Sequence, residues 1–253
     1  MPTPLELAED FTLYLPPRAG YLREVTDEYV LTCGNSGGTV ARIRLRDGDV
    51  ERALFDVRAR VTGQEIETVT WWCGENATPA DLPERLLELG LVPDDEAPTL
   101  AAMLLEEPPP GEPTAEVRPV ETFEDFCTAM AVDMESWPIP EPVRQRRLQR
   151  MPELWQTAQE QGAVHYLGYL DGEPVGQARA FFLDNAVLLL GGATLPRVRG
   201  SGVYFSLVHA RWRAAVERGT PRLVVQAGPM SRPILERLGF EKISEIRLLV
   251  DRL

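Results

Sequence analysis

The chain has 253 residues, of which 44% are hydrophobic, 26% charged and 8% aromatic. This composition is typical of globular proteins and excludes collagen-like, disordered and membrane-spanning chains. Residues 1–110 hold 9 Arg and 21 Asp plus Glu, a net charge of −12, whereas the remaining residues have a net charge of −1. An acidic protein repels nucleic acid and anionic lipid, so we expect neither as a partner.

The cysteines indicate neither a disulfide framework nor a metal site. Cys33, Cys73 and Cys127 form no CxxC pair and are odd in number. The first residues lack the basic and apolar regions of a signal peptide, and no uncharged apolar run reaches about 18 residues. We therefore expect a cytoplasmic protein.

Residues 1–107 show a mixture of strand and helix signals. Apolar and β-branched runs predict strands at 28–33, 40–45, 66–72 and 97–105, while 50–61 has mixed signals. Thr78, Pro79 and Asp81 are typical helix-start residues, leucines at helical spacing follow them, and Gly90 ends the helix.

The segment EEPPPGEPT, residues 106–114, contains too many prolines for a helix or a central strand. It predicts a linker at 108–114 between a domain of residues 1–107 and one of residues 115–253. The second domain should contain strands at 117–120, 164–170, 175–182, 186–194, 222–227 and 242–250, and helices at 122–135, 141–161 (interrupted at Pro152), 202–218 and 231–238.

Two leucine-rich segments resemble each other. PERLLELGLV (83–92) and RPILERLGFEKI (232–243) each follow one predicted strand and precede another. Such helices are common enough for the match to be coincidental, but two copies of one fold explain it better.

The segment 188–219 has the pattern of a phosphate-binding turn. A strand interrupted by Gly191 and Gly192 leads to Pro196, and Arg199-Gly200-Ser201-Gly202 then opens a long helix. A glycine turn at a helix N-terminus directs backbone N–H groups at one point and suits a pyrophosphate. The alternative is a glycine-rich turn that binds nothing.

This segment resembles the acetyl-CoA motif of the GNAT superfamily of N-acetyltransferases: strand, Pro, two residues, then R/Q-x-x-G-x-G/A. Tyr204 stands where the family has Gly or Ala. LVVQAGPMSRPILERLGFEKI, at the end of the chain, resembles the family's last strand, helix and LGF signature. The resemblance implies an α/β (α+β) fold with two GNAT-like domains in tandem, each a mixed, mainly antiparallel sheet flanked by helices. The N-terminal copy lacks the phosphate turn, so it looks degenerate.

The resemblance also implies which residues bind the cofactor, acetyl-CoA. A bulge at Gly191-Gly192 would open a gap in the sheet for pantetheine, and the glycine turn would hold the pyrophosphate. The expected cofactor-binding residues are Gly192, Ala193, Thr194, Arg199, Gly200, Ser201, Gly202, Val203, Tyr204 and Phe205.

Catalytic residues are harder to assign. Leu235 stands where many family members have the Tyr that protonates the leaving thiolate, and Gly228 where they have an Asn. Tyr204 and Ser231 are the replacement candidates, although Tyr204 also suits packing and Ser231 a helix N-cap.

Five further side chains are considered for the site or for packing. His165 is either a core histidine, which we favour, or an acceptor-cleft residue. His209 should lie on the surface, one of Trp71 and Trp72 should lie in the core and the other at a groove, and Gln226 serves the site or a turn.

The sequence thus predicts an N-acetyltransferase in which an amine attacks the thioester of acetyl-CoA directly. The acceptor would be a small-molecule or peptide amine, and the acidic N-terminal half suits a cationic one. The alternative, suggested by Leu235 and Gly228, is a catalytically silent acyl-CoA-binding sensor or interaction module.

Overall fold

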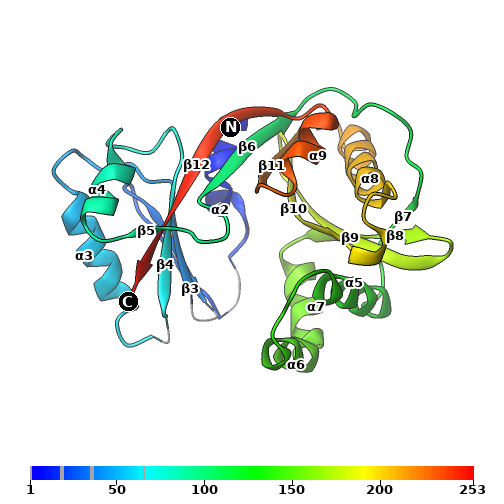
Figure 1. The fold of residues 1–253 in the computed structure, drawn as a ribbon, viewed down its shortest axis with the longest axis horizontal. Helices are drawn as coiled ribbons and strands as arrows, with labels where there is room; N and C mark the ends of the chain where they lie inside the picture. The colour runs from blue at the N-terminus through cyan, green and yellow to red at the C-terminus, as the bar shows by residue number, and fades with distance from the viewer. Residues whose placement is uncertain (1, 18–19, 35–36, 65) are drawn as a thin grey trace. The chain divides into compact units, whose positions relative to one another are not determined.

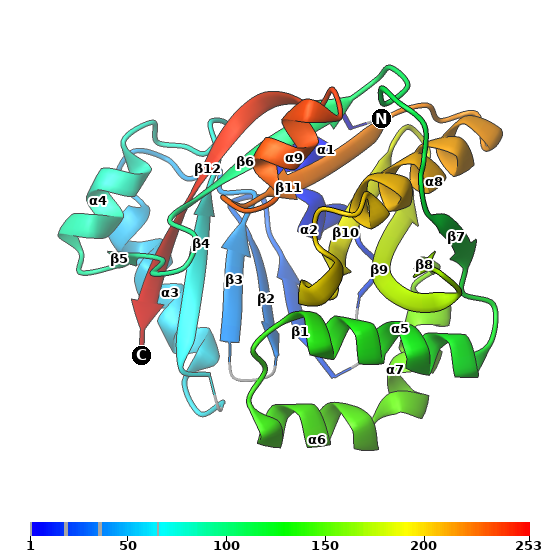
Figure 2. The same cartoon turned by 45° about the vertical axis from the view of Figure 1, so that its right-hand side comes forward.

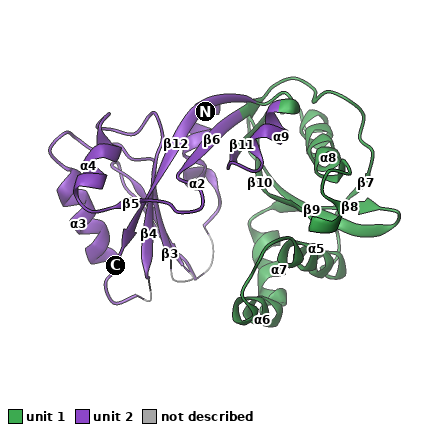
Figure 3. Ribbon diagram, viewed as in Figure 1, with its two compact units in different colours: residues 1, 104–225, 237–240 green, residues 2–103, 226–236, 241–253 purple. Residues whose placement is uncertain are grey.

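The computed structural model describes residues 2–17, 20–34, 37–64 and 66–253. The chain divides into two compact units (Figure 3). Unit 1 contains residues 104–225 and 237–240, and unit 2 contains residues 2–103, 226–236 and 241–253. The domain boundaries predicted from the sequence, residues 1–107 and 115–253, remain a prediction. The units are described in turn.

Unit 1 is built on a mixed sheet with the strand order β7-β8-β9-β10-β11 (Figure 1). β7 to β10 pair antiparallel, and β10 pairs parallel with β11. The strands are β7 (Glu116–Pro119), β8 (Ala163–Leu170), β9 (Glu173–Phe182), β10 (Val187–Thr194) and β11 (Leu223–Ala227). The last two residues of β11 belong to unit 2.

Helices cover both faces of this sheet (Figure 2). The helices of unit 1 are α5 (Phe123–Ser136), α6 (Glu141–Gln149), α7 (Met151–Glu160), the short 3-10 helix η1 (Pro196–Val198) and α8 (Val203–Glu217). Successive residues of a strand point to opposite faces. A Cβ at Gly176 of β9 would lie 2.5 Å from Val203 of α8, whereas the neighbouring Gln177 contacts Asp133 of α5. α8 and α5 therefore pack on opposite faces of β9.

The start of α5 shows how the sequence specifies a helix. Thr122 lies just before it in an extended conformation, and its hydroxyl accepts a hydrogen bond from the Asp125 amide. This N-cap satisfies one of the free N–H groups that every helix N-terminus leaves. Further along the helix, Phe126 and Met134 form a small core with Met151 and Ala158 between α5, α7 and the sheet.

The strands of unit 2 follow the order β1-β2-β3-β4-β12-β6, and β5 pairs with β12. β3 and β4 are parallel, as β10 and β11 are in unit 1. The strands of unit 2 are β1 (Leu22–Val25), β2 (Val30–Gly34), β3 (Gly37–Ala41), β4 (Thr68–Cys73), β5 (Val92–Pro93), β6 (Thr99–Leu105, which runs into unit 1) and β12 (Glu241–Arg252).

The helices of unit 2 are α1 (Pro4–Glu9), α2 (Phe11–Tyr14), α3 (Val50–Val61), α4 (Leu82–Glu88) and α9 (Arg232–Arg237). Its core joins α3 and α4 to the sheet around the fully buried Trp71. α3 resolves the mixed signals of residues 50–61. α1, α2, β1 and β5 were not predicted from the sequence.

The internal resemblance is matched by the local structure. α4 and α9 are each followed by a glycine with positive φ, Gly90 at 96° and Gly239 at 89°. Each lies between two strands, β4 and β5 for α4 and β11 and β12 for α9. The similar segments therefore occupy the same place in two similar successions of elements.

Cys33, Cys73 and Cys127 are free thiols. Within the described ranges, no helix is long and apolar enough to cross a membrane.

Candidate functional site

β10 contains the predicted bulge. Its register with β9 shifts between Leu190 and Gly192, so Gly191 is an extra residue, and its φ is +53°. Parallel pairing with β11 spans Val187–Leu189, whereas pairing with β9 continues to Thr194. Beyond the bulge, the β10 edge nearer β11 therefore has no registered strand partner among the described residues, and its backbone groups are available to a ligand.

The glycine turn follows directly. Gly200 and Gly202 have φ values of 85° and 87°, a conformation that side chains with a Cβ rarely adopt. Gly202 is the N-cap of α8, no described side chain caps the helix, and helical bonding starts with Ser206 N–H to Gly202 O at 2.9 Å. The N–H groups of Val203, Tyr204 and Phe205 thus lack helical acceptors and, with the helix dipole, favour an anion.

Tyr204 packs against the neighbouring strand. A Cβ at Gly192 would lie 2.8 Å from the Tyr204 ring, so glycine at 192 makes room for the tyrosine. Burial raises the pKa of the Tyr204 phenol. The side chain is thus held as a neutral packing group, while its backbone N–H stays at the start of α8.

Arg199 reaches away from the turn. Its Nη2 donates to the carbonyl of Ser136, the last residue of α5, at 3.0 Å. A cation at a helix C-terminus is favoured by the free carbonyls and by the dipole. Arg199 therefore ties the glycine turn to the end of α5.

The linker contributes contacts that the sequence did not indicate. The Oγ of the fully buried Ser206 accepts the amides of Thr114 and Ala115 at 3.1 and 3.0 Å and donates to Gly202 O at 3.1 Å. Thr114 Oγ1 donates to Ser201 O at 3.4 Å. The segment before β7 is thereby fixed beside the first turn of α8.

The α5 face of the sheet carries polar groups opposite β10. Gln177, paired in register with Ala193, donates from Nε2 to Asp133 Oδ1 at 2.7 Å. Two residues further on, the guanidinium of Arg179 lies over Gly191, with Nη2 3.5 Å from the position of a Cβ there. These long-range contacts have no local sequence signal.

The two histidines are both buried. His165 packs edge-on against Phe126, and burial, together with the nearby Arg179, lowers its pKa to about 3. The preferred core interpretation of His165 agrees with this position. The predicted surface position of His209 is wrong: it stacks on Phe205, its Nε2 lies 3.3 Å from Pro110 O, and it is 9% exposed because the linker covers that side of α8.

The remaining candidates have structural contacts in unit 2. Gln226 donates to the carbonyls of Ala8 and Glu9 at 2.9 and 3.0 Å, which fastens α1. Ser231 donates to Gly228 O at 3.4 Å.

Leu235 is fully buried. Trp71 is the core tryptophan, and Trp72 packs edge-on against Phe11 of α2 with ring centroids 5.8 Å apart.

The corresponding place in unit 2, after the parallel pair β3 and β4, is filled by the chain itself. Thr78 forms a parallel bridge with Arg44, its N–H donates to Ile43 O, and its carbonyl accepts from Leu45 N–H, both at 3.1 Å. The turn before α3 contains Asp47 and Asp49, whose charge opposes a phosphate. Unit 2 therefore offers neither the free strand edge nor the anion site of unit 1.

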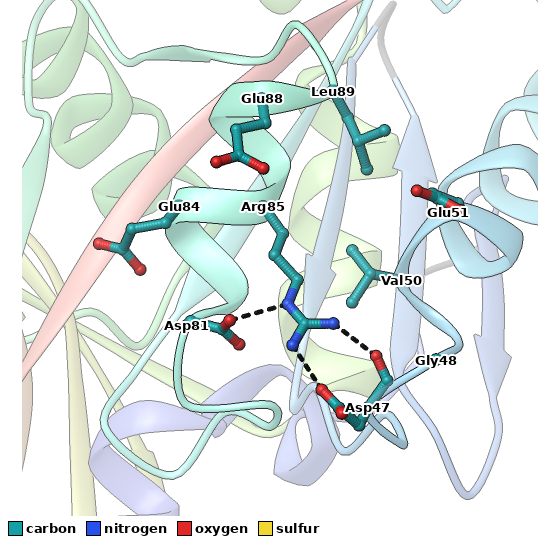
Figure 4. Close-up of a pocket in the computed structure, with 9 residues that line it drawn as sticks. All are labelled: Asp47, Gly48, Val50, Glu51, Asp81, Glu84, Arg85, Glu88 and Leu89. Atoms are coloured by element: carbon teal, nitrogen blue, oxygen red, sulfur yellow. Dashed lines mark hydrogen bonds and ion pairs between the residues drawn. The ribbon is translucent and has the colours of Figure 1, made fainter.

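A pocket of about 490 Å³ lies beside that acidic turn of unit 2 (Figure 4). Arg85 extends into it and binds Asp81 at 2.9 Å and the Asp47 carbonyl at 2.6 Å. Its lining includes five carboxylates, those of Asp47, Glu51, Asp81, Glu84 and Glu88. This pocket is chemically the opposite of the predicted phosphate site. The described part of the chain holds no cluster of three or more metal-ligating side chains.

Comparison with known proteins agrees with the GNAT-like fold expected from the sequence. Residues 128–240 match the model of the acetyltransferase (GNAT) family. A GCN5-related N-acetyltransferase from Kribbella flavida is similar in structure, with a TM-score of 0.69 and 17% identity over 99% of this chain and 96% of that one. No curated protein matches the sequence.

Two further solved structures are similar along most of their length. A tandem GNAT protein from the clavulanic acid biosynthesis pathway has a TM-score of 0.66 and 14% identity, covering 99% of this chain and 88% of that one. A functionally unknown conserved protein from Staphylococcus epidermidis has a TM-score of 0.65 and 11% identity, covering 92% and 94%. At these identities the likeness establishes the fold.

Proposed function

We propose that this chain, whose residues 128–240 match the model of the acetyltransferase (GNAT) family, is an acetyl-CoA-dependent N-acetyltransferase with one active site, in unit 1. The observation that supports it most directly is the succession of a bulged strand edge, two left-handed glycines and an uncapped helix. In this reaction the amine nitrogen bonds to the acetyl carbonyl carbon, the C–S bond breaks, and the proton lost by nitrogen ends on the thiol.

The residues of unit 1 fit such a cofactor. The Thr194 hydroxyl oxygen is buried at the end of β10 and lacks a partner among the described residues, as expected of a group that a ligand completes. The β10 edge beyond Gly191 suits an extended amide-containing chain, and the N–H groups of residues 203–205 suit a diphosphate. The chain's own part in the reaction is to hold the thioester at the bulge and to bring the amine to it.

A paired substitution tests the binding site. Gly200 and Gly219 both have positive φ, 85° and 75°, and a Cβ on either meets no atom within 4 Å. Gly200→Glu and Gly219→Glu therefore introduce similar strain and the same charge, one at the turn and one at the far end of α8. Acetyl-CoA at about 100 times its Kd stabilises the native protein by about 2.7 kcal/mol, which raises Tm by roughly 5–11 °C. We expect this rise in the wild type and in Gly219→Glu and its loss in Gly200→Glu.

An acyl-CoA sensor is the second candidate, because Tyr204 is packed away and Leu235 is buried. A sensor would show the Tm rise and no amine-dependent release of thiol from acetyl-CoA. An enzyme shows both. A wild-type protein without any Tm rise would refute both proposals.

A further inference from the structure

We propose that Ser206 and Thr114 are positioning residues of the diphosphate site, and that the linker thereby sets the affinity of the protein for acetyl-CoA. They hold the carbonyl ends of two peptide groups of the glycine turn, and the N–H ends of these groups face the expected anion. This inference rests on the proposed function and adds a means of regulating the same site.

The end of the linker follows one face of α8. Positions three and four residues apart share a helix face. Four positions at this spacing, the N-cap included, lie against residues 110–115: Gly202, Phe205, Ser206 and His209. Val203 and Tyr204 pack instead on glycines of the sheet. The start of α8 is therefore held from two sides, and its N-terminal end is left for a ligand.

Ser206 fixes the second peptide group of the turn. The Gly202 carbonyl accepts the Ser206 N–H at 2.9 Å and the Ser206 hydroxyl at 3.1 Å. In a planar trans peptide the C=O and N–H bonds point in opposite directions, so the Val203 N–H of this group points out of the helix N-terminus, where an anion binds. The amides of Thr114 and Ala115 donate to the fully buried Ser206 Oγ at 3.1 and 3.0 Å.

These two amides also orient the hydroxyl of Ser206. A serine oxygen has two lone pairs and one hydrogen. The linker amides occupy both lone pairs, so the hydrogen is directed to the Gly202 carbonyl. The position of the linker is thereby transmitted to the turn through a single buried atom.

Thr114 fixes the first peptide group in the same way. Its Oγ1 donates to Ser201 O at 3.4 Å, so the Gly202 N–H, which belongs to the same peptide, points away from the linker. The turn thus has its shape before the cofactor arrives. Donors arranged in advance bind a ligand more tightly, because less conformational freedom is lost on binding.

Two variants remove the hydroxyl groups. Ser206→Ala should raise the Kd for acetyl-CoA about 10-fold in titration calorimetry, and Thr114→Val, at an exposed position, about 2- to 5-fold, since one hydrogen bond corresponds to about 2- to 13-fold. Thr114→Ser keeps the hydroxyl and should keep the wild-type Kd. Thr157→Ala is the matched control, because Thr157 Oγ1 likewise donates to the carbonyl four residues earlier, at 2.8 Å, but in α7.

A ligand without the diphosphate separates positioning from a general effect on the fold. S-acetylpantetheine keeps the thioester and the amide arm of acetyl-CoA. Its Kd should change less than about twofold in Ser206→Ala and Thr114→Val, because neither substitution touches the edge of β10. Equal losses of affinity for the two ligands would overturn the proposal.

Hydrogen exchange measures the same coupling from the side of the linker. Coupling between two sites is reciprocal, so saturating acetyl-CoA should slow the exchange of the Thr114 and Ala115 amides about 10-fold in the wild type. Unchanged exchange of both amides would overturn the proposal, and so would a wild-type Kd in both Ser206→Ala and Thr114→Val. Failure of the wild type to bind acetyl-CoA would instead refute the proposed function itself.

Discussion

Replacing Gly202 by Ala tests whether the turn before α8 is fixed by the linker as well as by its own dihedral angles. Gly202 has φ of 87°, and a Cβ there would lie 2.3 Å from Thr114 Oγ1. Gly200 has nearly the same φ, 85°, but a Cβ there meets nothing within 4 Å. The two positions therefore share the backbone strain and differ in the clash.

The expected magnitudes follow from this difference. A residue with a Cβ in the left-handed region costs roughly 1–2 kcal/mol, so Gly200→Ala should lower the free energy of unfolding by that amount. Gly202→Ala must also displace Thr114. Overpacking of this kind costs about 1–3 kcal/mol, so Gly202→Ala should lower the free energy of unfolding by that much more than Gly200→Ala does. With Thr114→Ala, the nearest Thr114 atom left is Cβ at 3.7 Å, an ordinary contact.

The assay is a double-mutant cycle in urea, with Gly200→Ala as control. The cost of Gly202→Ala should fall by about 1–3 kcal/mol in the Thr114→Ala background, whereas the cost of Gly200→Ala should be the same in both backgrounds within about 0.5 kcal/mol. Equal costs for the two glycines, or no rescue by Thr114→Ala, would refute the reasoning that the linker packs against the turn.

Three further outcomes are expected. Titration calorimetry should give one acetyl-CoA per chain, because Thr78 fills the corresponding gap of unit 2; two equivalents would contradict this. Because the pKa of His165 in the folded protein, about 3, is below its unfolded value near 6.5, the unfolded chain binds more protons between these pH values. As the pH falls below 6.5, the free energy of unfolding of the wild type should therefore decrease by up to about 1.4 kcal/mol per pH unit more than that of His165→Phe. Urea unfolding at several pH values measures both, and parallel pH curves for the two proteins would refute this. Asp251 is buried and accepts two hydrogen bonds from Arg58 at 2.7 and 2.8 Å. Asp251→Asn should therefore lower the free energy of unfolding, measured in urea, by about 1.5–3 kcal/mol, and a loss below about 0.5 kcal/mol would show that the pair contributes little to stability.

The sequence predicted the elements whose signals are local. Thr122 caps α5, and Gly90 follows α4 with positive φ. Each of these features depends on the conformational preference of one residue type at one position. For the same reason, most strands and helices of unit 1 lie within a few residues of their predicted bounds. The bulge at Gly191 was expected from the family resemblance.

Features that depend on distant residues were missed. His209 is polar and has charged neighbours in the helix, and only the path of a linker about 99 residues earlier buries it. The contact of Gln177 with Asp133 joins positions 44 residues apart. The hydrogen bond of Arg199 to Ser136 likewise spans 63 residues, so a motif alone assigned Arg199 to the phosphates.

The roles of the site residues in binding stay predictions. The positions of Gly192, Ala193 and Thr194 on β10 and of residues 199–205 around the turn are compatible with them. Tyr204 is the residue whose expected chemistry is least compatible with its place, because its ring packs on Gly192.

Thr78 has a consequence for how the protein persists in a cell. Unit 2 closes its own gap with a segment that is always present, so its resistance to opening and to proteases does not vary with metabolite supply. Unit 1, on the proposed function, gains stability from acetyl-CoA by mass action and is weakest when that supply falls. Degradation during acetyl-CoA shortage should therefore begin with local opening in unit 1, around β10 and the start of α8, and the abundance of the protein would follow the availability of its own substrate.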